Sequence, residues 1–369
     1  MQLTRIKPFL LLICIFFAVQ SYAQVCNGSL GDPVINQDFG SGTNQGAALG
    51  FDVTNYTYYA NDCPNDGSYT IASRTTNCFG ASWHNLTQDH TGNPNGYMMI
   101  VNASNNPGLF YTQTVPAGQL CPNTTYEFAA YITNLIIPSA CNGASTQPNI
   151  TFIIETSDGT PIGQPYNTGD IPPTNDIEWK KYGTLFTTPA NVTSVIVKMI
   201  NNAPGGCGND LALDDITFRP CGAMIQTDFV TSTGPQPTKD ACIGDNVPII
   251  TKAQIVPANP NVTYQWQLNI NNQGWNDITG ANGDSYSGTI FNAVLGTYQY
   301  RVAIVNGPDP NVTTCRVYSL PITTTIHPLP IANSISPQSF CEGTTLSLAA
   351  TGATSYIWSG PNLPATNPL

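Results

Sequence analysis

Two adjacent carboxylates in the second half of the chain could bind a cation. Asp214 and Asp215 lie in the segment LALDDITF at 211–218, where apolar and polar residues alternate. Neighbouring side chains of a β-strand point to opposite faces, so one of the two carboxylates points toward the core side whichever face is buried. A buried carboxylate needs a partner, and the 369-residue chain has only 11 Lys and Arg in total. The sequence therefore predicts a bound cation at this strand, and oxygen ligands suit Ca²⁺.

Four aromatic residues are candidates for binding sugar: Trp83, Tyr97, Tyr131 and Trp179. An exposed aromatic ring can stack on the apolar face of a pyranose. The alternative for each of them is a side chain that fills the core of a β-sandwich, as large aromatic residues commonly do. Their positions in the sequence do not distinguish the two roles.

Catalytic motifs are absent from the sequence, which contains only three His. No Gly-x-Ser-x-Gly, His-Glu-x-x-His or phosphate-loop pattern occurs. His84, Asp89 and His90 could be read as metal ligands or as a catalytic pair, but we interpret them as loop structure in which Asp89 bonds the amides of its own turn. Glu155 and Glu178 could cleave a glycosidic bond only if the fold brought them together. We predict a binding protein and not an enzyme.

The N-terminal segment predicts export. Residues 1–23 carry a basic start, an apolar run at 9–19 and the small-residue sequence Ser-Tyr-Ala before position 24, which is the pattern of a secretory signal peptide. The apolar run is too short to span a bilayer, and no other stretch is long enough. We therefore expect a secreted or cell-surface protein without a membrane span, whose remaining ten Cys are largely oxidised.

Three disulfides follow from cysteine positions. Cys63–Cys78 is expected from proximity, and Cys141–Cys207 because both cysteines lie in Gly-rich loops. The order Cys242, Trp266, Cys315 is typical of immunoglobulin-like sandwiches, in which a Trp packs on an inter-sheet disulfide, so it predicts Cys242–Cys315.

Composition and local patterns favour an all-β protein. Charged residues make up 9% of the chain and the net charge is −11, which excludes a nucleic-acid partner because phosphate contacts need a basic surface. No window of the sequence shows convincing helical periodicity. Short apolar segments alternate instead with turns rich in Gly, Asn and Pro, at spacings typical of sandwiches or barrels.

Changes in composition divide the mature chain into three parts: 24–222, 225–327 and 328–369. A polar linker at 232–237 and the sequence Pro-Leu-Pro at 328–330 mark the boundaries. Cys-Ile-Gly-Asp at 242–245 and Cys-Glu-Gly-Thr at 341–344 are each followed by Tyr-x-Trp, so the last two parts look like repeats. The predicted architecture is a jelly-roll sandwich followed by Ig-like sandwiches. The last one is incomplete, because 42 residues cannot form a two-sheet core.

The first part resembles a known fold at its two ends. Asn36-x-Asp38-Phe39 and Ala212-Leu-Asp-Asp-Ile216 are similar to the first and last strands of galactose-binding-like jelly rolls, the fold of many carbohydrate-binding modules and of MAM adhesion domains. Asp-His-Thr-Gly at 89–92, leading into 96–101, resembles the matching MAM segment.

This resemblance has two consequences for named residues. It implies that Cys121 pairs with Cys221, which leaves Cys26 unpaired; a competing arrangement joins Cys26 to Cys221 and leaves Cys121 as a buried thiol. It also places the first and last strands side by side, which implies a structural Ca²⁺ site made by Asp38, Asp214 and Asp215. Gly40 stands where carbohydrate-binding modules usually carry Glu, so one expected ligand is missing.

The first part carries three long motifs, CPNDG at 63–67, CPNTTYEF at 121–128 and NNAPGGCGND at 201–210, and is followed by Ig- or PKD-like repeats. In these features the chain resembles the large surface proteins of Bacteroidetes that are called gliding-motility-associated and are exported by the type IX system. The resemblance covers most of the chain and implies an adhesion protein whose jelly roll binds glycan or matrix. Two alternatives remain: a structural surface protein without a dedicated ligand, or the non-catalytic N-terminal part of a secreted enzyme that degrades polysaccharide.

Overall fold

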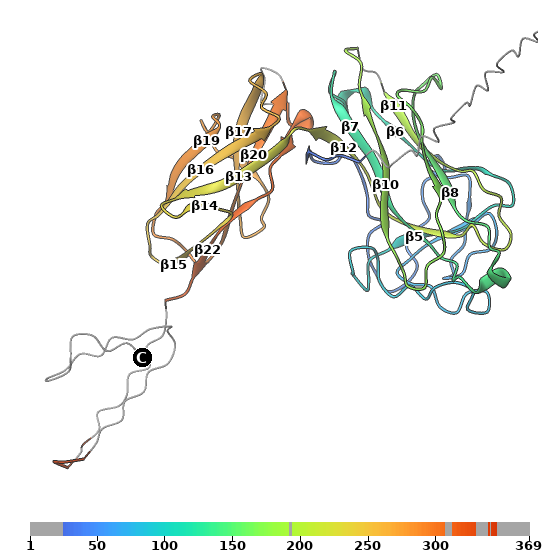
Figure 1. Cartoon of the computed structure of the whole chain (residues 1–369), viewed down its shortest axis with the longest axis horizontal. Coiled ribbons are helices and arrows are strands. Elements are labelled where there is room, and N and C mark those ends of the chain that lie inside the picture. Colours follow the sequence, from blue (N-terminus) through green and yellow to red (C-terminus); the bar gives the residue numbers. More distant parts are fainter. Residues whose placement is uncertain (1–24, 192–193, 307–311, 330–338, 340, 345–369) are drawn as a thin grey trace, which may run out of the picture. The chain divides into compact units, whose positions relative to one another are not determined.

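The chain folds as β-strands in two compact units. A computed structural model describes residues 25–191, 194–306, 312–329, 339 and 341–344, and the division between the units lies between Gly222 and Ala223 (Figure 1). Strands make up 48% of the described residues, and no α-helix occurs among them, so the predicted all-β class is confirmed. The predicted signal peptide and most of the predicted third part lie outside the described residues.

The first unit contains a large sheet with the strand order β10-β7-β12-β5-β4-β3, and β1 and β2 also pair with β12 (Figure 1). All neighbours are antiparallel except β3 and β4. The strands of this sheet are β1 (Ser29–Leu30), β2 (Ile35–Gln37), β3 (Thr57–Tyr58), β4 (Ser68–Ala72), β5 (Met98–Asn102), β7 (Thr125–Asn134), β10 (Lys180–Thr187) and β12 (Leu211–Gly222).

A smaller antiparallel sheet, with the order β6-β11-β8-β9, packs on one face of the large sheet. Its strands are β6 (Gly108–Val115), β8 (Asn149–Thr156), β9 (Tyr166–Asp170) and β11 (Val195–Asn201). Alternation builds the core between the sheets: Val195, Val197 and Met199 of β11 are fully buried, and so are Phe128 and Ile132 of β7. The side chains between them, such as Tyr131, therefore lie on the outer face of the large sheet.

Part of that outer face is covered by a second apolar cluster. Met98, Ile100 and Ala212 point outward from β5 and β12 and pack with loop residues that include Trp83 and Leu86. This cluster covers the outer face of β5, so β5 is buried on both faces. Polar and aromatic residues lie on the remaining part of the outer face, over β7 and β10.

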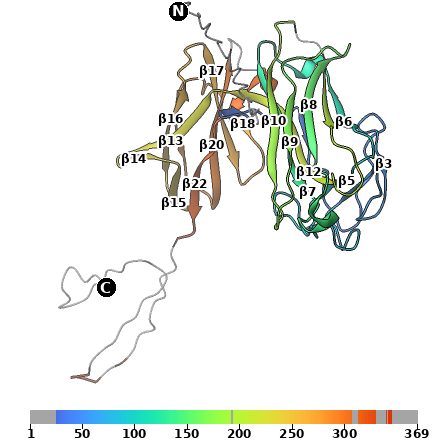
Figure 2. The same cartoon turned by 45° about the vertical axis from the view of Figure 1, so that its right-hand side comes forward.

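The second unit is a smaller two-sheet sandwich, which Figure 2 shows from another side. One sheet has the order β14-β13-β16-β19 and the other β15-β22-β20-β17-β18, with β21 paired to β20. The strands are β13 (Met224–Thr231), β14 (Gly234–Gln236), β15 (Thr238–Cys242), β16 (Val247–Val256), β17 (Val262–Ile270), β18 (Asn276–Asp277), β19 (Ser285–Ile290), β20 (Gly296–Asn306), β21 (Val317–Tyr318) and β22 (Ile322–His327).

Trp266 of β17 is the largest fully buried side chain of the described residues, in agreement with its expected core position. It packs with Ile225, Ala253 and Val302 from both sheets, and its indole N–H donates to the carbonyl of Gly283 over 3.1 Å. β16 alternates strictly between buried and exposed positions, as expected for a strand with one solvated face.

Two of the predicted disulfides are confirmed and one is wrong in the first unit. Cys63–Cys78 and Cys141–Cys207 are present. Cys221 bonds to Cys26 and not to Cys121, because β1 pairs with β12 at Leu30 and Cys221 and so brings the N-terminal segment alongside Cys221. The competing arrangement is right about Cys26–Cys221 but wrong about Cys121, which is itself disulfide-bonded.

The predicted Cys242–Cys315 bridge is also wrong. Cys242 is a free, half-buried thiol, whereas Cys315 is disulfide-bonded. Cys242 is the last residue of the edge strand β15 and pairs with His327 of β22. The neighbouring residue Ile326 pairs with Gly296, the first residue of β20, so Cys242 lies at the end of the sheet where β20 begins. Cys315 lies just before β21, which pairs with β20 at Ile304. Eight residue steps from Gly296 to Ile304 amount to about 27 Å, far beyond disulfide reach.

The predicted sequence repeat forms the same turn twice. Residues Cys242 and Cys341 each accept a hydrogen bond at the carbonyl from the amide three positions later, over 3.2 Å in both cases. The third residue of each turn is a glycine with φ of 88°, a conformation that a side chain would strain. Trp358, the second Tyr-x-Trp tryptophan, lies outside the described residues.

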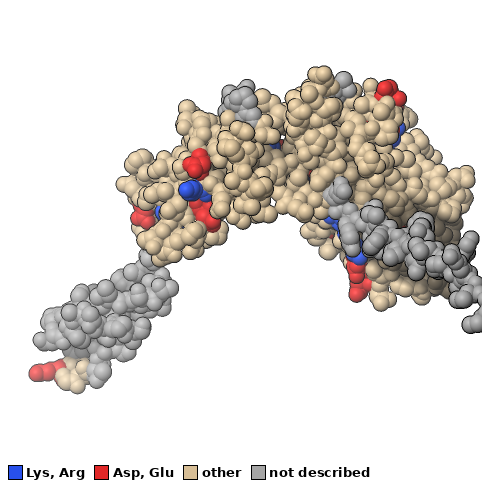
Figure 3. All heavy atoms as spheres, turned by 45° about the horizontal axis from the view of Figure 1, so that its top comes forward, with Lys and Arg blue, Asp and Glu red and all other residues tan. Residues whose placement is uncertain are grey.

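Charged side chains are sparse on the face of the molecule that Figure 3 shows. No helix among the described residues is long and apolar enough to span a membrane.

Candidate functional site

A β-bulge brings Asp214 and Asp215 to the same face of the large sheet. Asp214 of β12 is opposite Tyr131 of β7, whereas Thr217 is opposite Ala129, so β12 holds one extra residue between these pairs. Asp215 has φ of 45° at this point. Leu213 and Ile216 on either side remain fully buried in the core. Neither carboxylate therefore points between the sheets, and the expectation that strict alternation directs one of them inward is wrong.

The loop before β5 brings His90 to these two carboxylates. Asp89 holds the loop, because its carboxylate accepts hydrogen bonds from the amides of Thr91 and Asn93 over 2.8 and 2.9 Å. Gly96 passes so close to this carboxylate that a Cβ there would lie 1.7 Å from Asp89 Oδ2. The predicted role of Asp89 in its own turn is thus confirmed, and the turn fixes the neighbouring His90.

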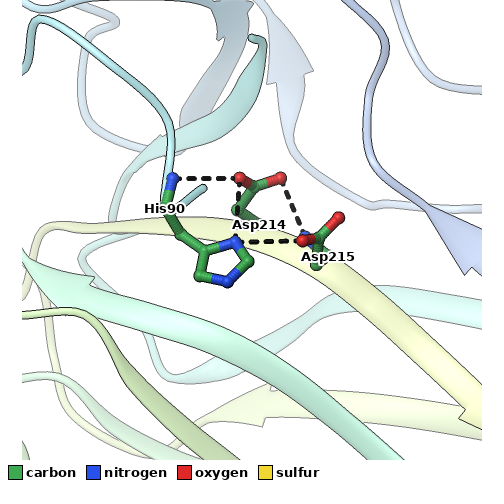
Figure 4. Close-up of side chains that lie close together, drawn as sticks. All are labelled: His90, Asp214 and Asp215. Atoms are coloured by element: carbon green, nitrogen blue, oxygen red, sulfur yellow. Dashed lines mark hydrogen bonds and ion pairs between the residues drawn. The ribbon is translucent and has the colours of Figure 1, made fainter. Parts of the chain in front are cut away.

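His90, Asp214 and Asp215 form a compact cluster (Figure 4). His90 Nδ1 lies 3.0 Å from Asp215 Oδ2 and 3.5 Å from Asp214 Oδ2. Asp214 also accepts the amide N–H of His90 over 3.2 Å and that of Asp215 over 2.8 Å. The side chain of Asp214 is 2% exposed, that of His90 16% and that of Asp215 27%, so the cluster is buried on one side and open at Asp215.

Burial and mutual repulsion make the ionised carboxylates costly in this cluster. Desolvation raises the pKa of Asp214 to about 7, and the charge of Asp215 adds to the effect. Desolvation also raises the pKa of Asp215, and Asp38 and Asp89 contribute in the same direction while His90 opposes them. Among the described residues, the ion pairs of Asp214 and Asp215 are those with His90. The cluster therefore has excess negative charge that an added cation would neutralise.

Two half-exposed aromatic residues surround His90. The ring of Tyr131 stacks on the imidazole with centroids 3.7 Å apart. Trp179, just before β10, meets the imidazole edge to face at 6.3 Å. Two of the four predicted sugar-binding residues are thus brought together on the outer face of the sheet, beside both predicted carboxylates of β12.

The other two predicted aromatic ligands are core residues. Trp83 is 2% exposed and belongs to the second apolar cluster, where its indole N–H donates to Asp210 over 3.0 Å. Tyr97 is 9% exposed and packs into the core between the sheets. Neither can offer a ring face to a ligand, because the strands and loops around them cover both faces.

Asp38 lies near the cluster but does not complete it. Its side chain is exposed and accepts the amide of Gly40 over 3.1 Å, while the ligand atoms that lie within 4.8 Å of one another come from His90, Asp214 and Asp215. The expected adjacency of the first and last strands is present, since β2 pairs with β12. The charge of Asp38 acts on Asp215 from outside the cluster.

The other titratable candidates have partners outside the cluster of His90, Asp214 and Asp215. His84 is buried, with Nε2 3.1 Å from the carbonyl of Thr174. Glu155 pairs with Lys198, and Glu178 pairs with Lys180 at 3.3 Å. Each of the two glutamates that could have formed a glycosidase pair is therefore neutralised by its own lysine.

His90 is the site residue that the sequence interpretation placed in a loop without a ligand role. Its partners are more than 120 positions away in the sequence, so no local spacing reveals them. The only local signal is the Asp89 turn, which fixes the direction of the loop but not what the loop meets.

The loop that carries His90 also lines a cavity of about 370 Å³. Hydroxyl and amide side chains dominate its wall, and Arg74 adds a cation. The lining residues are Thr43, Ser73, Arg74, Thr75, Thr76, Asn85, Leu86, Thr87, Pro94 and Asn95. Such groups form hydrogen bonds with sugar hydroxyls as readily as with water.

No family model and no curated protein matches this sequence. Among solved structures, the chain is similar to a sugar-binding protein, the C-terminal domain of EclA, with 16% identity and a TM-score of 0.23 over 31% of this chain and 69% of that one. It is also similar to a tandem of two CBM22 domains from Paenibacillus barcinonensis, with 10% identity and a TM-score of 0.28 over 82% of this chain and 92% of that one.

A third similar structure is the glycoside hydrolase domain of Endo-D from Streptococcus pneumoniae, with 9% identity and a TM-score of 0.20 over 64% of this chain and 34% of that one. The similar structures thus include sugar-binding domains.

Proposed function

We propose that the protein is an exported glycan-binding protein that holds its ligand on the outer face of the large sheet, at Tyr131, Trp179 and Asp215. The observation that carries this proposal is the gathering of two half-exposed aromatic rings and a partly exposed carboxylate around His90. Aromatic rings supply the apolar contact that a pyranose face needs, and a carboxylate accepts hydrogen bonds from its hydroxyl groups.

Export and adhesion belong to the same proposal. The disulfides of the first unit are those of a protein that matures in an oxidising compartment. We place the protein at the cell surface, with glycan or matrix as its partner and no catalytic activity of its own. The pairing of Glu155 and Glu178 with separate lysines favours binding over glycoside cleavage.

The test is a glycan array, followed by sedimentation with cellulose, chitin and xylan, on the exported chain. We expect Trp179→Ala to weaken binding about tenfold, because truncating a central aromatic anchor costs more than 1 kcal/mol. The matched control is Tyr59→Ala, which removes an aromatic residue that is 40% exposed outside the site.

A wild-type chain that binds no glycan on the array would overturn the proposal. So would equal losses for Trp179→Ala and Tyr59→Ala. Trp179→Phe keeps a ring in place and should retain most of the binding, which separates the loss of a contact from the loss of the fold.

A further inference from the structure

We propose that His90, Asp214 and Asp215 form a binding site for a divalent ion of borderline softness, with Zn²⁺ as the best fit. This site differs from the calcium site expected from the sequence in its ligands and in its ion. It does not rest on the proposed glycan binding.

The distances between the ligand atoms match what such an ion requires. Zinc bonds to nitrogen and carboxylate oxygen are ~2.0 to 2.2 Å long, and a tetrahedral arrangement then separates two ligand atoms by roughly 3.4 Å. His90 Nδ1 lies 3.0 Å from one carboxylate oxygen and 3.5 Å from the other. All three ligand atoms lie within 4.8 Å of one another, so one ion can reach them with small side-chain movements.

The state of His90 Nδ1 points independently to a ligand. This atom is buried and has no hydrogen-bond partner of acceptable geometry, although a carboxylate oxygen is 3.0 Å away. A buried polar atom without a hydrogen bond is costly and rare. An ion that lies among the three side chains would satisfy Nδ1 through its lone pair and both carboxylates through their charge.

The surroundings hold the ligands in place for binding. Tyr131 stacks on the imidazole and fixes the plane of the ring, while the amides of His90 and Asp215 fix the carboxylate of Asp214. Hydrogen bonds to ligating carboxylates are a regular feature of protein metal sites. The nearby charges of Asp38 and Asp89 add to the negative potential that attracts a cation.

The chemistry of the ligands selects the ion. Calcium takes six to eight oxygen ligands and rarely an imidazole, whereas zinc accepts one imidazole and two carboxylates readily. Three protein ligands leave the fourth zinc position for water. Asp38 is therefore not required, because its exposed carboxylate lies outside the ligand set.

The experiment titrates the exported chain with zinc chloride alone, after removal of metal with EDTA. The free thiols of Cys242 and Cys341 are first alkylated with iodoacetamide, because thiolates also bind zinc. Calorimetry and elemental analysis should find one zinc ion per chain. The melting temperature should rise with zinc, since an ion that binds only the folded state stabilises it.

Two variants identify the ligands. His90→Phe keeps a ring stacked on Tyr131 but removes the nitrogen, and we expect it to lower zinc affinity more than tenfold. Asp38→Asn is the matched control, because it removes a nearby charge without removing a ligand, and it should change affinity less than threefold.

Three outcomes would overturn the proposal: no zinc bound at 100 μM, equal zinc affinity in His90→Phe and wild type, or tighter binding of calcium than of zinc with loss of calcium in Asp38→Asn. The last outcome would establish the oxygen-only site instead. No glycan is used, so failure of this test leaves the proposed function standing, and failure of the glycan array leaves the metal site standing.

Discussion

Two aspartates, one in each unit, have opposite kinds of partner: Asp210 of the first unit is buried, and Asp277 of the second is 42% exposed. In the first unit, Asp210 is 3% exposed and accepts hydrogen bonds from neutral donors, the indole of Trp83 and the amide of Ala103. In the second, Asp277 accepts two hydrogen bonds of 2.8 Å from the guanidinium of Arg316, which is 2% exposed. The same residue type thus lies beside neutral partners in one sandwich and beside a cation in the other.

The electrostatic consequences follow from the partners. Desolvation raises the pKa of Asp210 to about 7, and its neutral donors compensate only in part. The hydrogen bond from Arg316 lowers the pKa of Asp277 below its usual value. Asp210 therefore favours the protonated form, as Asp214 does, whereas Asp277 is stabilised in its ionised form. Uncompensated carboxylates are a common feature of functional sites, and here they occur in the unit that carries the candidate site.

Replacing a bonded cysteine pair of the first unit and a free cysteine of the second should give the largest difference in unfolding free energy. Cys26–Cys221 closes a loop of 195 residues in the first unit, whereas Cys242 of the second unit is free. Replacing both Cys26 and Cys221 by Ala should lower the free energy of unfolding by about 5 kcal/mol, because the unfolded chain regains loop entropy. Cys242→Ala should change it by less than about 1 kcal/mol. Equal losses in urea unfolding would contradict this difference.

The ion pair of the second unit is expected to produce the next largest effect. Asp277→Ala leaves the Arg316 guanidinium buried without its carboxylate, so it should cost about 2 kcal/mol of unfolding free energy. Asp284→Ala removes an exposed carboxylate of the same unit and should cost less than about 0.5 kcal/mol. Thermal unfolding of both variants measures the contrast, which fails if the two melting temperatures agree.

The pH dependence of stability should have opposite signs for the two carboxylates. The folded pKa of Asp210, about 7, lies above its unfolded value of 3.8. Its contribution is therefore fully present below pH 3.8 and is lost as the pH rises toward 7, with a slope of at most about 1.4 kcal/mol per pH unit. Asp210→Asn keeps an acceptor for Trp83 and should reduce the slope of urea unfolding between pH 4 and 7 by the part due to Asp210, while Asp214, whose pKa is also raised to about 7, keeps its own part. An unchanged slope would exclude Asp210 as its source.

For Asp277 the sign is reversed. Because its folded pKa is lowered, its contribution is present above pH 3.8 and is lost as the pH falls through the folded pKa. Asp277→Ala should therefore reduce the acid sensitivity of the chain below pH 4, the range in which Asp210 contributes no slope.

The smallest expected effect concerns Arg301 of the second unit. Its guanidinium lies over the rings of Trp275, at 4.3 Å from the centroid, and of Tyr318, at 3.7 Å. Trp275→Ala should cost about 1 kcal/mol through the lost cation–π contact, and Trp275→Phe less than that. Thermal unfolding that finds Trp275→Ala as stable as the wild type would contradict a contribution from this contact.

Local sequence patterns predicted the strands and several of the contacts. The alternation in β11 and β16 and the turns rich in Gly and Asn were sufficient for the all-β class. Proximity was sufficient for Cys63–Cys78, whose members lie 15 positions apart. The core position of Trp266 was predicted from the order Cys242, Trp266, Cys315 and is confirmed, although the disulfide expected beside it is not formed.

Predictions of contacts between distant residues failed where the order of strands in the sheet sets which residues meet. The pattern Cys, Trp, Cys suggested a bridge across the second unit, but Cys242 and Cys315 lie at opposite ends of β20. Trp83 and Tyr97 could not be separated from Tyr131 and Trp179 by sequence, because burial depends on which loops cover each ring.

The sequence by itself determined that the chain forms β-sandwiches and that few cations would be available for its carboxylates, because periodicity and composition are local properties. Only the tertiary structure decided that Asp214 and Asp215 share a face and meet His90. One extra residue in β12 relative to β7 shifts the alternation, and a strand's own sequence carries no record of the register of its neighbour.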